Sequence, residues 1–179
     1  MRILNLGCGK DKYSTRRMIK LDPKDDVVGL DMLKLDGVDV VHDLNKLPLP
    51  FKDESFDIVY SAHVLEHLDD VDALCKDIHR ILKPNGKMIA IVPHHTNPCA
   101  YSHHHKKYWS MTSFDSIENT RTISNMTMLF KVCKKIKLLR PFGWLEHFAN
   151  RFPDFYEWRL SGFIPAIEIH FELKKVIKK

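Results

Sequence analysis

The sequence has no long apolar run and few cysteines, and both absences narrow the class of protein. None of its hydrophobic stretches approaches the ~20 residues that span a bilayer, and residues 1–10 lack the basic start and long apolar core of a signal peptide. The four cysteines form no C-x-x-C pair and no ladder of close spacings, so neither a zinc ribbon nor a disulfide framework is indicated. We therefore expect a cytoplasmic protein with no membrane span.

Glycine is scarce as well, at seven of 179 residues, so the pair in the opening stretch ILNLGCGK stands out. A phosphate-binding P-loop requires G-x-x-x-x-G-K-[ST], and this spacing is absent after Gly7 and Gly9. A dinucleotide fingerprint requires a third glycine where Lys12 stands. The remaining interpretation is a turn after a strand, whose backbone approaches a nucleoside-containing ligand that has no pyrophosphate.

The composition fits one domain over residues 1–179, but the charge is unevenly distributed. Hydrophobic residues make up 44% and charged residues 28% of the chain, which is typical of a globular protein. Residues 1–93 carry 14 Lys and Arg against 16 Asp and Glu, a net −2, whereas residues 94–179 carry 14 against 7, a net +7. The basic half leaves two alternatives open: an anionic acceptor or nucleic acid, and an ordinary solvated surface.

Strand and helix patterns alternate through the first half, which is typical of a parallel sheet with crossover helices. Apolar spacing predicts a helix that starts at Val71, with Asp69 or Asp70 as its N-cap, and stops at the sequence KPNG. The five predicted strands are Ile3–Leu6, Val27–Leu30, Val38–Val41, Phe56–Ser61 and Lys87–Val92.

The second half of the chain lacks the regular alternation of strand and helix patterns seen in the first half. Residues 93–125 show little periodicity and predict a long irregular loop that leads to a helix near Ser113–Thr122. Thr127–Leu139 is a predicted sixth strand, and Gly143–Leu160 a helical or lid-like insertion. Alternating apolar and polar residues predict that Ile167–Ile177 is a half-buried antiparallel edge strand. The expected fold class is therefore α/β, with seven strands, mostly parallel.

Two acidic residues follow predicted strands and complement the glycine turn. Asp31 ends the second strand, at a spacing suited to ribose hydroxyls. Asp43 follows the third strand, where its carboxylate could accept a hydrogen bond from an adenine amino group while the Leu44 N–H meets a ring nitrogen. Because the carboxyl ends of parallel strands form the ligand-binding edge of open α/β sheets, we expect these groups to lie together.

Taken in order, these motifs resemble the class I S-adenosylmethionine-dependent methyltransferases, in particular the small enzymes that share an LEH motif. The matching stretches are ILNLGCG, VVGLDM, VVHDLNKLPLPFKDESFDIVYSAHVLEHL and HRILKPNGKMIAIVPH. The resemblance implies a Rossmann-like fold with helices on both faces of the sheet and S-adenosylmethionine as the cofactor. It also implies that residues 1–93 bind the cofactor and that residues 94–179 form the acceptor side.

By this resemblance, the residues around the glycine turn and the strand ends contact the cofactor. Gly7 and Gly9 pack against its amino-acid portion, and residues 61–63 line its reactive end. The implied cofactor-binding residues are Asn5, Leu6, Gly7, Cys8, Gly9, Asp31, Met32, Asp43, Leu44, Ser61, Ala62 and His63.

The sequence departs from the family pattern at its start. The stretch KDKYSTRRMIKLDPKDD has only a short patch of helical character, so we expect a truncated or irregular first crossover. No helix precedes the first strand in the sequence given. Cover for the cofactor must then come from the later loops or from a second subunit, which leaves a homodimer open.

Methyl transfer is an in-line displacement that depends mainly on positioning, although an oxygen or nitrogen acceptor benefits from a base. His63 is the candidate catalytic base because SAHVLEH starts at the carboxyl end of the fourth strand. The alternative is a histidine that contacts the cofactor or is held structurally. Glu66 and His67 stand among apolar neighbours, which favours a capping or packing role.

The histidine-rich loop admits two specific interpretations, a metal site and an acceptor pocket. His103 and His105 share a face if extended, but no carboxylate lies near them in sequence, so we expect no metal. An exposed polar loop with its aromatic residues in the core is an equal alternative. The predicted acceptor-side residues are His94, His104, His105, Tyr108 and Trp109.

The acceptor class follows partly from what is missing. SAHV stands after the fourth strand, where the family uses an N-P-P-Y-like tetrapeptide for planar amino groups. No appended RNA-binding domain is visible. We therefore expect a small-molecule, glycan or lipid-linked acceptor. RNA as acceptor and a non-catalytic partner subunit are the alternatives.

Overall fold

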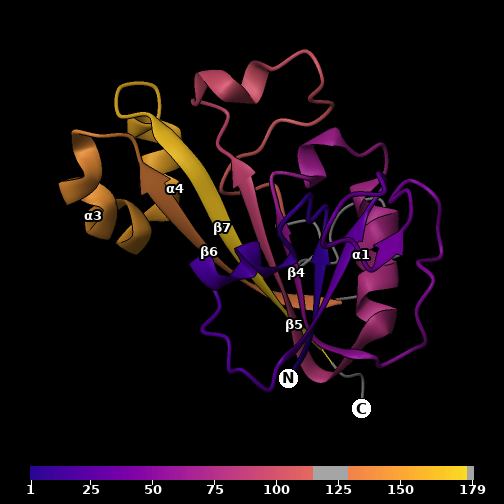
Figure 1. Ribbon diagram of the computed structural model, residues 1–179. Helices are drawn as coiled ribbons and strands as arrows, with labels where there is room; N and C mark the ends of the chain where they lie inside the picture. The colour runs from indigo at the N-terminus through magenta and orange to yellow at the C-terminus, as the bar shows by residue number, and fades with distance from the viewer. Residues whose placement is uncertain (115–128, 177–179) are drawn as a thin grey trace.

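The computed structural model describes residues 1–114 and 129–176, and a seven-stranded sheet organises them (Figure 1). The strands lie in the order β3-β2-β1-β4-β5-β7-β6. Their bounds are β1 Arg2–Leu6, β2 Asp26–Asp31, β3 Val40–Val41, β4 Phe56–Ala62, β5 Leu82–Pro93, β6 Phe130–Leu138 and β7 Ala166–Lys175. The α/β class and the mostly parallel sheet predicted from the sequence are confirmed.

The five parallel strands place their carboxyl ends at one edge of the sheet, which is where open α/β sheets bind ligands. The chain runs outward from β1 through β2 to β3, then returns to the other side of β1 with β4 and β5. Ile3, Leu4 and Leu6 have no exposed surface, as expected of a strand covered on both faces. Strand order thus reverses at β1, and in open α/β sheets such a switch point opens a crevice at the carboxyl ends.

One face of the sheet is covered by α1 (Val71–Ile81). The Asp70 side chain caps this helix by accepting a 2.8 Å hydrogen bond from the Ala73 N–H. The apolar side of the helix packs on β1, β4 and β5 in one buried cluster. The helix ends at Ile81, before Pro84, and the chain passes directly into β5. Asn85 in the KPNG turn takes a positive φ of 64°.

The other face is covered by a much shorter segment. A 3₁₀ helix, η1 (Lys12–Arg17), stands between β1 and β2, which confirms the truncated crossover expected from the sequence. Ile19, just after it, packs against Ile3, Val27 and Ile58 in a second buried cluster. Helical segments therefore lie on both faces, but the first crossover contributes only a 3₁₀ turn.

Strands β7 and β3 differ from the prediction. β7 is antiparallel, as predicted, but it lies between β5 and β6 and is not an edge strand. Its alternating pattern arises because one face is buried while the other carries Glu168, His170 and Glu172. β6 forms the edge instead. The predicted third strand, Val38–Val41, is also shorter, since only β3 pairs with β2.

The remaining described segments are short helices and loops. The predicted helical insertion is confirmed as four pieces: η4 Phe142–Leu145, α3 Glu146–Arg151, α4 Pro153–Phe155 and η5 Tyr156–Leu160. Two further 3₁₀ turns, η2 Leu65–His67 and η3 Pro98–Tyr101, lie above the carboxyl ends of the parallel strands. Most of the helix predicted near residues 113–122, and residues 127, 128 and 177 of the predicted strands, lie outside the described residues. Within the described residues, no helix is both long and apolar enough to cross a membrane.

Candidate functional site

A cavity of about 440 Å³ opens at the switch point of the sheet, and we call it the switch-point cavity. Its walls come from the turn after β1, the end of β2, the segment after β3 and the turn after β4, as strand topology predicts. Its lining residues are Gly7, Asp31, Met32, His42, Asp43, Leu44, Asn45, His63, Val64, His67, Leu68 and Lys106. The structure therefore brings together six of the predicted cofactor-binding residues: Gly7, Asp31, Met32, Asp43, Leu44 and His63.

The glycine turn has a left-handed backbone conformation that favours glycine over other residues. Gly7 and Gly9 have φ angles of +61° and +56°, in the left-handed region that glycine adopts readily. A Cβ on Gly7 would stand 2.4 Å from Val64 Cγ2, whereas one on Gly9 would meet nothing within 4 Å. The turn thus lets the backbone approach both the cavity and the segment after β4.

Asp31 braces this turn in addition to facing the cavity. Its Oδ2 accepts a 2.9 Å hydrogen bond from the Gly9 N–H, and its Oδ1 accepts one of 3.0 Å from the Leu33 N–H. A carboxylate has about four lone-pair sites, so acceptor capacity remains for a ligand hydroxyl. Asp31 therefore couples the glycine turn to the end of β2.

The other predicted cofactor-binding residues do not line the cavity. They are Asn5, Leu6, Cys8, Gly9, Ser61 and Ala62. Asn5 is buried and donates to the Lys12 carbonyl and the Ser14 hydroxyl, each at 3.1 Å, so its side chain holds the start of η1. Burial, and next the Asp31 carboxylate, raise the pKa of the Cys8 thiol to about 11, which keeps it in the neutral form.

Several lining residues were missed by sequence reasoning. His42 and Asn45 flank the predicted pair Asp43 and Leu44, so their neighbourhood was a usable signal. Lys106 comes from the irregular loop of the second half, far away in sequence. Its N–H donates a 2.7 Å hydrogen bond to the Glu66 carbonyl, which fixes this loop over the cavity. No local pattern in the sequence predicts that contact.

A second cavity of about 560 Å³, which we call the loop cavity, adjoins the first. It lies between the turn after β4, the end of β5 and residues 97–105. Its lining residues are His63, Glu66, His67, Pro93, Asn97, Pro98, Cys99, Tyr101, Ser102 and His105. His63 and His67 line both cavities, so these two side chains form a shared wall.

His63 occupies this wall in a strained and highly charged setting. Its φ is +54°, an unusual value for a residue other than glycine. Its ring nitrogens lie 3.6 Å from Glu168 and 3.5 Å from Glu66. These carboxylates, Glu168 first, raise the pKa of His63 to about 9, so its ring is protonated at neutral pH. An imidazolium has no lone pair to accept a proton, which favours the alternative of a structurally held histidine, and the role of catalytic base remains a prediction.

Of the five predicted acceptor-side residues, only His105 lines the loop cavity. His94 has no exposed surface, and its nitrogens face the Thr96 hydroxyl at 2.7 Å and Glu157 at 3.2 Å. The exposed His104 ring lies against His103, 3.7 Å between ring centroids. The structure thus places His94 in a buried polar network and His104 on the surface, and neither lines the loop cavity.

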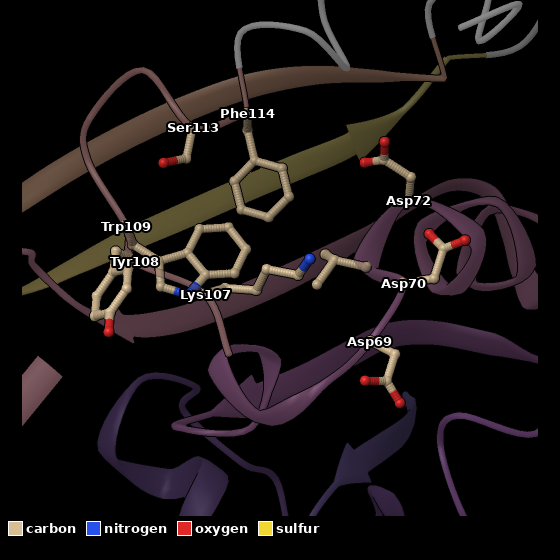
Figure 2. Close-up of a pocket in the computed structure, with 9 residues that line it drawn as sticks. Asp69, Asp70, Asp72, Lys107, Tyr108, Trp109, Ser113 and Phe114 are labelled. Carbon is tan, nitrogen blue, oxygen red and sulfur yellow. The ribbon is translucent and has the colours of Figure 1, made fainter. Parts of the chain in front are cut away.

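Tyr108 and Trp109, also predicted on the acceptor side, line a third cavity of about 350 Å³ near the start of α1 (Figure 2). Asp69, Asp70, Asp72 and Lys107 surround it, and it shares no lining residue with the other two cavities. Trp109 is 5% exposed and stacks on Phe114 at 5.2 Å. Trp109 therefore lies in the core, which favours the alternative interpretation for this residue.

Comparisons with known proteins agree with this architecture. Residues 4–90 match the model of a methyltransferase domain family. Demethylmenaquinone methyltransferase from Lactococcus lactis is 26% identical over 200 aligned positions, which cover 97% of this chain and 73% of the relative. The enzyme of the same name from Lactobacillus johnsonii is 33% identical over 53% of this chain, and only 45% of that relative is covered.

The likeness to solved structures concerns the fold. A SAM-dependent methyltransferase from Aquifex aeolicus superimposes with a TM-score of 0.62 at 14% identity, covering 98% of this chain and 82% of the other. The comparisons do not single out the LEH-motif group. The domain match, the sheet order and the cavity at the switch point together support a class I methyltransferase that uses S-adenosylmethionine as its cofactor.

Proposed function

We propose that this protein transfers the methyl group of S-adenosylmethionine, bound in the switch-point cavity, to a small molecule bound in the loop cavity. The observation that carries this proposal is the shared wall of His63 and His67 between the two cavities. Methyl transfer requires an acceptor atom about 3 to 3.5 Å from the methyl carbon, so the two ligands must meet at a common boundary. Residues 1–93 would supply most of the cofactor site, and the loop of residues 97–105 the acceptor side.

The lining of the loop cavity favours an acceptor with a flat apolar body and polar oxygens. Pro93, Pro98 and Tyr101 offer apolar surface, while Asn97 and His105 offer hydrogen-bonding groups. The two relatives named as demethylmenaquinone methyltransferases support a small-molecule acceptor, and a quinol is the first class to test. Glycan and lipid-linked acceptors should also be tested. RNA should be tested as well, because the second half of the chain is basic.

The test has two stages. Calorimetric titration with S-adenosylmethionine and S-adenosylhomocysteine is expected to show micromolar binding at one site. Incubation with labelled cofactor and a panel of quinols, phenols, glycans and RNA, read by mass spectrometry, is then expected to label a small hydroxylated or quinol acceptor. Cofactor binding without turnover on any acceptor would favour the partner-subunit alternative, and transfer to RNA alone would overturn the small-molecule assignment.

Replacing Asp31 with alanine is expected to weaken cofactor binding by about 1 to 3 kcal/mol, the cost of losing a hydrogen bond that involves a charged group. The loss has two sources, since Asp31 faces the cavity and also accepts from the Gly9 N–H. Calorimetric titration of the folded variant measures the change.

Asp39→Ala is the matched control for Asp31→Ala. The Asp39 carboxylate also accepts from a glycine N–H, that of Gly29 at 2.8 Å, but it does not line the switch-point cavity. Cofactor affinity should therefore hold in Asp39→Ala. Equal affinities in the two variants would remove Asp31 from the cofactor site.

A further inference from the structure

Three side chains on the wall of the loop cavity form a cluster of metal-ligating type. One carboxylate oxygen of Glu66 and one ring nitrogen each of His67 and His105 lie within 4.8 Å of one another. Glu66 and His67 belong to η2, and His105 to the loop that crosses above it. The sequence separates these residues, which is why no metal-ligand spacing was visible in it.

The carboxylate of Glu66 is buried without full compensation. Glu66 is 1% exposed, and its Oε2 has no hydrogen-bond partner in the described part of the chain. Its other oxygen, Oε1, lies 3.5 Å from His63 Nδ1. Burying a carboxylate oxygen without a partner is costly, so such a group indicates a ligand that the chain itself does not provide.

Each of the two histidines has its Nδ1 on a backbone carbonyl. The Nδ1 atoms of His67 and His105 lie 3.2 Å and 2.9 Å from the carbonyl oxygens of His104 and Ala100. A carbonyl oxygen can only accept, so each Nδ1 donates, and each neutral ring keeps its lone pair on Nε2. A backbone carbonyl on the other ring nitrogen is a common outer-shell arrangement in metal sites, where it fixes both tautomer and orientation.

Hydrogen bonds hold the backbone around the cluster in place. The N–H groups of Lys106 and Lys107 donate to the Glu66 carbonyl at 2.7 Å and 3.2 Å. The rings of His67 and His105 are packed edge to face, with 4.7 Å between centroids. The three candidate ligands are therefore brought together before any ion binds.

A second cluster is formed by His94, His95 and Glu157. Both nitrogens of His94 already have partners, Thr96 and Glu157. Glu157 also accepts from the Met111 N–H at 3.4 Å. The buried Nδ1 atom of His95 has no hydrogen-bond partner among the residues that the structure describes and lies 3.6 Å from Glu157. Because His94 and the Glu157 carboxylate are already engaged in a buried polar network, this cluster indicates an ion less strongly than the first.

We propose that Glu66, His67 and His105 bind a divalent transition-metal ion on the wall of the loop cavity. Two imidazoles and one carboxylate are a ligand set that suits zinc and similar ions, whereas magnesium and calcium prefer oxygen ligands throughout. Three protein ligands leave a coordination position open, which is the arrangement of catalytic rather than structural zinc sites. That position would face the loop cavity, which all three residues line.

The role of this ion in catalysis rests on the proposed function, methyl transfer to an acceptor in the loop cavity. An acceptor hydroxyl at the open position would lose its proton to solvent more readily beside the cation. Its oxygen lone pair would then form the bond to the methyl carbon while the electron pair of the C–S bond returns to sulfur, giving S-adenosylhomocysteine.

Titration of chelator-treated protein with Zn²⁺ and with Co²⁺ tests the proposal without any acceptor. We expect one tight site by calorimetry and, for Co²⁺, the visible absorption of a site with nitrogen and oxygen ligands. His105→Ala is expected to lower the affinity more than about tenfold, because losing even an outer-shell partner of a metal ligand costs about 10- to 100-fold. Glu66→Gln should do the same while keeping the size of the side chain.

His103→Ala is the matched control, because it removes a histidine of the same loop that stacks on His104 and is outside the cluster. It should leave metal affinity unchanged. Loss of binding in His103→Ala but not in His105→Ala, or equal affinity in all variants, would overturn the site.

Cofactor titrations of the same samples separate this proposal from the previous one. His105 does not line the switch-point cavity, so His105→Ala should bind S-adenosylmethionine normally. Normal cofactor binding with no metal binding to the unmodified protein would overturn the metal site alone. Metal binding without cofactor binding would overturn the proposed function and leave the metal site standing.

Discussion

Replacing Gly7 with alanine is expected to abolish measurable cofactor binding and to destabilise the protein. The new Cβ would stand 2.4 Å from Val64 Cγ2, and the residue must keep a φ of +61°. The left-handed backbone costs about 1 to 2 kcal/mol for a residue other than glycine. Crowding in a packed site adds about 1 to 3 kcal/mol. Urea unfolding and calorimetric titration with S-adenosylmethionine measure the two effects.

Gly7→Ala should weaken cofactor binding because the contact with Val64 can be relieved only by moving residues at the cavity wall. Val64 is β-branched and has few rotamers available, so its backbone must move if its side chain cannot. Val64 also lines the switch-point cavity and leads into η2, so that movement displaces the wall beside His63. We therefore expect cofactor affinity to fall more than the stability loss alone would cause.

Gly9→Ala separates the two contributions. Gly9 has nearly the same φ, +56°, but an added Cβ would meet no atom within 4 Å. Only the backbone cost of about 1 to 2 kcal/mol is then expected, and the Gly9 N–H can still donate to Asp31. If Gly7→Ala and Gly9→Ala lose equal stability and equal affinity, contact with Val64 is not what requires glycine at position 7.

The sequence allowed prediction of those parts of the site that depend on chain order and strand ends. Apolar runs located β1, β2 and β4, and residues that follow parallel strands must meet at one edge. Gly7, Asp31 and Asp43 therefore reach one cavity without any knowledge of side-chain packing. The truncated first crossover was equally visible, because too little helical pattern stands between β1 and β2.

The parts that escaped prediction depend on contacts between distant segments. Glu66 stands among apolar residues, which suggested packing, and its partner His105 lies in a loop with no periodic pattern. Trp109 and His104 are near neighbours in that loop, yet one is buried and the other exposed. The sequence predicts β7 as an edge strand because a strand with one polar face has the same pattern whether or not another strand pairs beyond it.

Replacing Asp77 with alanine is expected to cause the largest loss of stability among the charge removals considered, about 3 kcal/mol, the cost of breaking a buried pair by removing one partner. Asp77 on α1 is 8% exposed. Its Oδ2 accepts from the Leu49 N–H and its Oδ1 from Arg80 Nε, both at 2.6 Å. Arg80 in turn donates to the carbonyls of Leu49 and Phe51. Urea unfolding measures the loss.

This network ties the segment after β3 to α1, so its loss should also reach the cofactor. The segment carries Asp43 and Leu44 into the switch-point cavity before it turns through Leu49. In Asp77→Ala the Leu49 N–H loses its acceptor and Arg80 loses the carboxylate that orients it. Affinity for S-adenosylmethionine should therefore fall along with stability, although Asp77 does not line the cavity.

Asp53→Ala tests whether burial or merely the charge pair with Arg80 matters. Asp53 bonds the same guanidinium at 2.8 Å, but its side chain is 74% exposed. Exposed ion pairs contribute at most about 1 kcal/mol, because water and salt screen them. Asp53→Ala should therefore unfold within about 1 kcal/mol of the unmodified protein and bind the cofactor normally. Equal destabilisation by both variants would show that the Leu49 contact contributes little, and that Asp77 does not hold the segment that carries Asp43 to the site.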